Sequence, residues 1–107
     1  MIDLPLPISA YFKADAAGGE AVAQCFTETA AVKDEGHIYA GRDAIRKWKS
    51  NASAKYNYVS QPFAVAAEGD RTVVTSHVTG NFPGSPVDLR YVFVLEGDKI
   101  AALEILA

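Results

Sequence analysis

The sequence has little of several features that define whole classes of protein. Its 107 residues include one cysteine, Cys25, so no internal disulfide can form and nothing requires an oxidising compartment. Lysine and arginine number 10 against 13 aspartates and glutamates, which gives a formal net charge of −3. Non-specific binding to nucleic acid needs a surplus of positive charge, so this balance argues against nucleic acid as a partner.

Long apolar runs and ligand-binding motifs are also missing. The longest stretch without a charged side chain, residues 72–87, is too short and too polar to span a membrane. The N-terminal residues lack a basic segment and include two prolines, so we expect no signal peptide and a cytoplasmic protein. Two histidines without a metal-ligand spacing predict no metal, and the lack of a glycine-rich phosphate loop predicts no nucleotide or other cofactor.

The first half of the chain carries helix signals. Pro5 and Pro7 suit the start of a helix, and the glycine pair at 18–19 is a stop signal. A short second helix should follow and include Phe26. A third helix should open at residues 41–43, with Ile45 and Trp48 on its apolar side. The basic residues around them are expected on a solvated face: Arg46, Lys47 and Lys49.

The second half carries strand signals. After an expected hairpin of strands at 30–34 and 37–39, β-branched and aromatic residues alternate with small or polar ones, between recognisable turns. This pattern predicts four strands, at 58–67, 71–82, 87–96 and 100–106. Length and composition predict a single domain over residues 1–107. The order of elements predicts the α+β class, with three N-terminal helices on one face of a curved antiparallel sheet.

Three segments resemble the nuclear transport factor 2-like superfamily, and within it the SnoaL-like and ketosteroid-isomerase-like proteins. Residues 25–34, CFTETAAVKD, are similar to the family's approach to its first strand. Residues 39–48, YAGRDAIRKW, resemble the start of its third helix, and residues 91–105 resemble its last two strands. The resemblance implies a cone-shaped, cystatin-like roll around a largely apolar pocket. It also implies a small apolar or aromatic ligand and a homodimer formed through the sheet.

The resemblance points to Asp34 as the residue that would carry chemistry. In isomerase-like members, the Asp at this place is the base that shuttles a proton. An apolar pocket solvates a carboxylate poorly, which makes it a better base. The alternative is an exposed acid at the end of a strand that helps Glu35 and Gly36 to form a turn.

Tyr11, Tyr91 and His77 are the other residues considered for catalysis. Tyr11 falls where the isomerase-like pattern has a donor to an oxyanion, although a tyrosine there can equally be a packing residue. Tyr91 occupies the place of that pattern's second acid, so steroid isomerase activity is not predicted. His77 would be an acid–base partner of Asp34 if its strand face is the inner one, but polarity alone also allows the outer face.

Two classes of function follow from these residues. The first is a SnoaL-like protein that binds a small molecule, or acts on it as an isomerase, cyclase or hydrolase without a cofactor, with Asp34 as the base. Trp48, Tyr91, Phe93 and Leu103 would then line the ligand site. The second is a non-catalytic ligand-binding or dimerisation module. The position of Asp34, in a cavity or at a rim, distinguishes the two.

Overall fold

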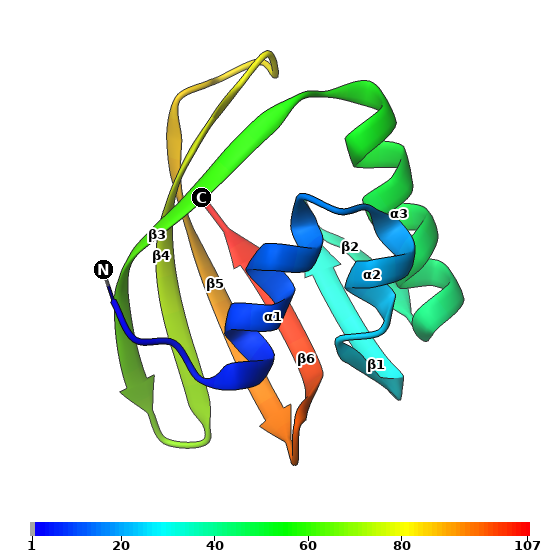
Figure 1. The fold of residues 1–107 in the computed structure, drawn as a ribbon, viewed down its shortest axis with the longest axis vertical. Coiled ribbons are helices and arrows are strands. Elements are labelled where there is room, and N and C mark those ends of the chain that lie inside the picture. Colours follow the sequence, from blue (N-terminus) through cyan, green and yellow to red (C-terminus); the bar gives the residue numbers. More distant parts are fainter. Residues whose placement is uncertain (1) are drawn as a thin grey trace.

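Three helices lie against one face of a six-stranded sheet in the computed structural model of the chain, which describes residues 2–107 (Figure 1). In chain order the elements are α1 (Leu6–Asp15), α2 (Gly19–Ala23), β1 (Phe26–Asp34), β2 (His37–Ala40), α3 (Arg42–Lys55), β3 (Tyr58–Glu68), β4 (Arg71–Gly80), β5 (Val87–Glu96) and β6 (Lys99–Leu106). In Figure 1, α1 crosses in front of β5 and β6, and α2 and α3 lie at the β1–β2 end of the sheet.

Prolines and glycines set the helix boundaries. Pro5 precedes α1 and Pro7 lies in its first turn, where a missing N–H leaves no hydrogen bond unmade. Gly18 and Gly41 precede α2 and α3 with φ of 118° and 86°, a backbone region that other residues rarely adopt. The three expected helices are therefore present, and the first and third begin where the sequence indicates.

The sheet order is β2-β1-β6-β5-β4-β3. The α+β class and the curved sheet are confirmed, but the sheet is mixed because β1 and β6 run parallel while the other neighbours are antiparallel. After α3 the chain begins its meander at the far edge, with β3, and works back toward the centre. Its last strand, β6, therefore arrives beside β1 in the same direction.

The first strand begins four residues earlier than its sequence pattern indicates. Phe26 was expected in the second helix, but it pairs with Ile100 as the first residue of β1. The pairing register shifts between Phe26 and Ala31, and such an irregularity breaks the alternation by which a strand is recognised. Arg42, at the start of α3, donates from both Nε (3.0 Å) and Nη2 (2.9 Å) to the Phe26 carbonyl oxygen.

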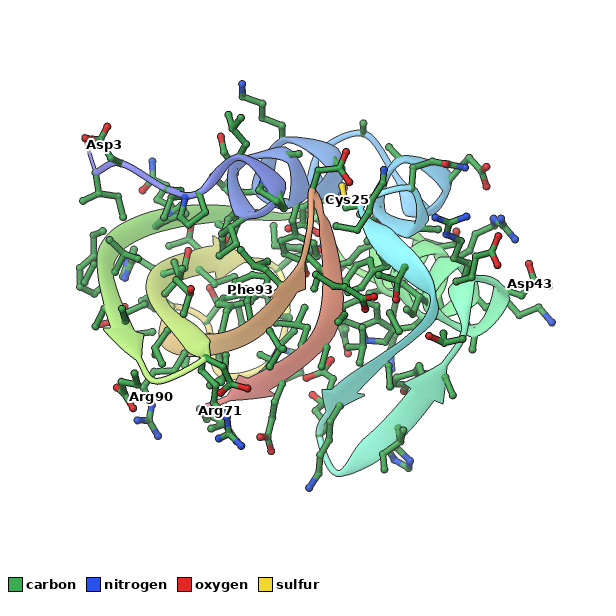
Figure 2. The ribbon with its side chains drawn as sticks, turned by 90° about the horizontal axis from the view of Figure 1, so that it is seen from below. Asp3, Cys25, Asp43, Arg71, Arg90 and Phe93 are labelled. Carbon is green, nitrogen blue, oxygen red and sulfur yellow. The ribbon has the colours of Figure 1, made fainter. Side chains whose placement is uncertain are left out.

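The core lies between the helices and the inner face of the sheet. Its buried side chains come from all three helices and from β1, β4, β5 and β6, and they include Ile8, Tyr11, Val22, Phe26, Val32, Ile45, Trp48, Val74, Tyr91, Phe93, Ile100 and Leu103. Figure 2 shows Phe93 inside the curve of the sheet, with Arg71 and Arg90 on the opposite side. The curved sheet and the helices thus surround one interior, toward which alternate residues of each strand point.

Arg42→Ala should destabilise the fold, because the carbonyl oxygen of Phe26 would lose the two hydrogen bonds that it accepts from the charged guanidinium group. We expect the free energy of unfolding to fall by about 1.5–3 kcal/mol, the usual range for hydrogen bonds to charged groups. Urea denaturation measures it, with the exposed Lys47→Ala as the control in the same helix. Equal stability of the two variants would show that Arg42 does not support the start of β1.

Candidate functional site

Asp34 ends β1 and is half-buried. The indole Nε1 of Trp48 donates a hydrogen bond to its Oδ2 at 3.0 Å, and Trp48 is a buried residue of α3. The carboxylate is therefore held against the helix side of the sheet, although its backbone pairs with His37 next to the turn. Among residues 2–107, no donor bonds the second oxygen, Oδ1, which leaves it available to a ligand.

Tyr11 is completely buried, with 0% of its surface exposed. Its ring packs edge-on against Phe26 and Phe93, and its hydroxyl has no hydrogen-bond partner among the described residues. Burial raises the pKa of this phenol well above its usual value, and the negative charges of Asp15 and Asp34 raise it further. The hydroxyl is therefore neutral and able to donate at any physiological pH.

A buried ion pair lies beside Tyr11, between α1 and α3. Lys49 Nζ is 2.6 Å from Asp15 Oδ1, and both side chains are more than nine-tenths buried. Tyr58, the first residue of β3, accepts from Lys49 Nζ at 3.0 Å and donates to Asp15 Oδ1 at 2.8 Å. Burial, followed by the charge of Asp15, raises the pKa of the Tyr58 hydroxyl, so this hydroxyl also keeps its proton.

The prediction that Lys49 lies on a solvated face of its helix is wrong. Only 5% of the residue is exposed, and its ammonium group lies 4.4 Å from the centre of the Trp48 ring and 5.7 Å from that of Tyr11. The sequence did contain a signal. Lys49 follows the apolar Ile45 by four residues, so the two lie on the same face of the helix. Asp15 follows Tyr11 by four residues and shares a face with it in the same way.

A second group of polar side chains lies on the inner face of β3, β4 and β5. The hydroxyl groups of Ser60 and Ser76 are 2.6 Å apart, and Ser76 is fully buried. Burial raises the pKa of Tyr91 to about 12, with the Ser60 hydroxyl acting in the opposite direction. These hydroxyl groups therefore lie beside a core that is otherwise largely apolar.

The structure decides between the two faces considered for His77. Val74, Ser76 and Val78 of β4 point inward and are buried, so His77 points to the outer face, where 45% of its side chain is exposed. Its Nδ1 is 2.7 Å from Asp88 Oδ1 of the neighbouring strand. This position separates His77 from Asp34 and Tyr11, and a catalytic partnership among the three does not fit the fold.

The four residues expected to line a ligand site all face the interior. Tyr91 and Phe93 are alternate residues of β5, and Leu103 of β6 lies directly across from Phe93 in the sheet register. All three are buried in the same core cluster as Trp48 of α3. They are placed to form an apolar wall next to the polar groups.

Two hollows lie at other places on the molecule. One of about 300 Å³ lies between the N-terminal segment, α1 and β3, lined in part by Leu4, Phe12 and Pro62. Another, of about 220 Å³, lies on the outer face of the sheet. Asp34 and Tyr11 line neither hollow, so neither hollow is the pocket that was expected around Asp34. Phe12 packs edge-on against Tyr11 (5.2 Å between ring centres) and Tyr91 (5.1 Å), so it separates the first hollow from the buried site.

Two further properties bear on the kind of site. Among residues 2–107, no group of three or more His, Cys, Asp or Glu side chains is arranged to bind a metal ion. The same part of the chain has no helix with the length and hydropathy needed to cross a membrane.

Comparison with known proteins places these features in a family. A family model described as the SnoaL-like domain matches residues 8–103. A candidate polyketide cyclase from Sinorhizobium meliloti has a similar structure, with a TM-score of 0.91 and 39% identity over 97% of this chain and 96% of that chain. None of the curated proteins matches this chain in sequence.

Two more distant structures share the fold. A protein with a ketosteroid isomerase-like fold from Catenulispora acidiphila, in complex with trimethylamine, has a TM-score of 0.86 and 18% identity over 98% of this chain and 87% of that chain. The epoxide hydrolase/cyclase-like enzyme SalBIII, with a role in pyran ring formation in salinomycin, has a TM-score of 0.77 and 21% identity over 94% and 86% of the two chains.

Lys49→Met should strongly destabilise the protein, because it leaves the Asp15 carboxylate buried without its counter-ion. Breaking such a pair from one side costs about 3–5 kcal/mol. The double variant Asp15→Leu/Lys49→Met should recover most of that loss, since both charges are gone. Lys47→Met is the exposed control. Urea unfolding compares the four proteins, and a single variant as stable as its control would mean that the ion pair is not buried in solution.

Proposed function

This chain belongs to the SnoaL-like domain family, and on that premise we propose that it binds a small apolar or aromatic carbonyl compound inside the cone and transfers a proton on it without a cofactor. The observation that carries the proposal is that a carboxylate and a hydroxyl group, both with unused hydrogen-bonding capacity, lie on the helix side of the sheet. Asp34 offers a carboxylate oxygen that no described residue occupies, and Tyr11 offers a buried hydroxyl without a partner.

The chemistry follows from these two groups. Asp34 would remove a proton from the carbon next to the carbonyl group, while Tyr11 donates a hydrogen bond to the carbonyl oxygen as negative charge develops there. The Trp48 indole would hold the carboxylate in position. Returning the proton to another carbon gives an isomerase. If the enolate carbon instead attacks a second carbonyl group of the same molecule, a C–C bond forms, the C=O bond becomes a single bond, and its oxygen takes the proton from Asp34. That reaction is a cyclisation.

The similar structures favour this class of reaction over simple binding. The Sinorhizobium protein is a candidate polyketide cyclase, and SalBIII takes part in forming a ring. A steroid isomerase is not proposed, because Tyr91 stands where that pattern has its second acid. His77 is left out of the mechanism because it lies on the outer face.

Asp34→Asn should abolish proton transfer to and from carbon, because an amide is not a base at neutral pH. The probe is 2-tetralone, an aromatic ketone, whose exchange of α-hydrogen for deuterium in D₂O is followed by proton NMR. We expect the exchange catalysed by the protein to fall by about 100-fold or more. Glu35→Gln, the adjacent exposed acid, is the matched control and should keep the wild-type rate.

Two results would contradict the proposal. One is exchange in Asp34→Asn at the rate of Glu35→Gln. The other is a wild-type protein that binds the ketone, as reported by Trp48 fluorescence, and yet exchanges its hydrogens no faster than buffer. The second result would favour the non-catalytic binding module.

We also propose that the outer face of the sheet pairs with a second copy of the chain. Large apolar side chains are exposed there, with Ile38 at 68%, and Val59 and Phe63 lie along β3. The hollow of about 220 Å³ on this face is lined by Val92, Val94 and Ala102, among others. Apolar sheet faces of this kind are usually covered, and two-fold pairing is the commonest solution.

Light scattering should therefore give the mass of a dimer at tens of micromolar. Val94→Arg should yield monomers by placing a long charged side chain inside the hollow, which Lys33, Arg71 and Glu104 already border. Leu6→Glu is the control, since Leu6 is 85% exposed but lies on α1, on the opposite side of the sheet. A wild-type monomer, or an unchanged dimer in Val94→Arg, would refute pairing through this face.

A further inference from the structure

The mechanism above assigns no role to the buried ammonium group of Lys49, although this group lies next to Tyr11 and Trp48. Trp48 connects it to the proposed base: the edge of the indole donates to Asp34, and Lys49 Nζ lies 4.4 Å from the ring centre. The indole ring of Trp48 therefore contacts both the Asp34 carboxylate and the Lys49 ammonium group. Two carboxylates, Asp15 and Asp34, and one ammonium give this cluster a formal charge of −1.

That charge constrains the ligand. Binding an anionic ligand would change the total formal charge of cluster and ligand from −1 to −2 in a poorly solvated interior. A neutral ligand is therefore favoured. When Asp34 takes a proton from carbon, the cluster keeps its total of −1. The negative charge moves from the carboxylate to the oxygen of the ligand, and it is stabilised most where that oxygen lies next to Lys49.

The donors of Lys49 and Tyr11 outnumber the acceptors that the described residues offer them. An ammonium group has three N–H bonds. Tyr58 accepts one of them from Lys49 and Asp15 Oδ1 is its ion-pair partner at 2.6 Å, so at least one N–H bond has no acceptor among the described residues. Tyr11 Oη has no partner, and Lys49 Nζ lies 5.7 Å from the centre of the Tyr11 ring. One bound oxygen can accept the third N–H bond and the Tyr11 hydroxyl together.

We propose that Lys49 Nζ and Tyr11 Oη together bind the carbonyl oxygen of the substrate and stabilise the charge that develops on it. The substrate class is then a neutral ketone or 1,3-dicarbonyl compound with an acidic C–H bond within reach of Asp34. This inference rests on the proposed function, because it assigns a partner to the same proton transfer.

The transfer is balanced within the site. The C–H bond breaks, its proton goes to the free oxygen of Asp34, and its electron pair forms the C=C bond of an enolate whose charge lies on the oxygen beside Lys49. Asp34 later returns the proton. Asp15 and Tyr58 act through Lys49, because they hold its ammonium group in place. They are positioning residues.

The probe is 4-nitrophenol, a stable mimic of an enol whose anion absorbs visible light, so one titration reports both affinity and charge. Asp34→Asn serves as the background because its neutral amide stands for the protonated base, and it should bind the phenolate about tenfold more tightly than wild type. Adding Lys49→Met should weaken binding by about tenfold or more, and the bound probe should become the neutral phenol. Adding Tyr11→Phe should weaken binding without that change of colour.

Lys47→Met in the same background is the matched control and should bind like Asp34→Asn. If Lys49→Met does not fold, Asp15→Leu/Lys49→Met in that background makes the same test without an unpaired buried charge. Phenolate bound with unchanged affinity and colour in the variant that lacks Lys49 would overturn the inference. That outcome is separate from failure of the proposed function, which would show as hydrogen exchange that persists in Asp34→Asn or is absent in the wild-type protein.

Discussion

The ion pair between Asp15 and Lys49 joins the parts of the fold that surround the interior. Asp15 ends α1, Lys49 lies in α3, and Tyr58 begins β3, so three elements meet at one set of hydrogen bonds. Removing two charges from water is costly, and apolar side chains of similar size often stabilise a protein as well or better. The contribution of this pair is therefore mainly one of position: it places an ammonium group next to Tyr11 and Trp48.

The two faces of the sheet are suited to different tasks. Inward-pointing residues combine an apolar wall, such as Phe93 and Leu103, with hydroxyl and charged groups that are nearly all satisfied by one another. Among residues 2–107 the buried hydroxyl of Tyr11 has no partner, and a ligand oxygen would complete its hydrogen bonding. The outer face exposes apolar side chains and carries the His77–Asp88 pair, so it is suited to contact with another surface.

Much of the fold could be predicted because its signals are local. Prolines and glycines mark the helix ends, and alternation between turns marks the strands from β3 to β6. The parallel pairing of β1 with β6 is a contact between distant segments, and the register shift after Phe26 hides the start of β1. Neither feature has a signal within a short window of sequence.

The candidate site was predictable only in part. Asp34 and Tyr11 are candidates that family resemblance suggests, whereas Lys49 was misplaced because a lysine is ordinarily solvated unless a partner is buried with it. That partner, Asp15, lies 34 positions earlier in the chain, so only the folded structure brings the two together. The face of His77 could not be chosen, because both faces of β4 mix apolar and polar residues.

The central claim is that the Tyr11 hydroxyl is held inside the protein without a native partner, ready for an oxygen of the ligand. The free energy of unfolding of Tyr11→Phe tests it most directly, because this change removes the hydroxyl and little else. The account predicts that the free energy of unfolding of the variant equals that of wild type or exceeds it by up to about 1 kcal/mol, because a buried hydroxyl group without a partner is removed. A loss of more than about 1 kcal/mol would show that the hydroxyl already has a partner within the fold, and would contradict the account.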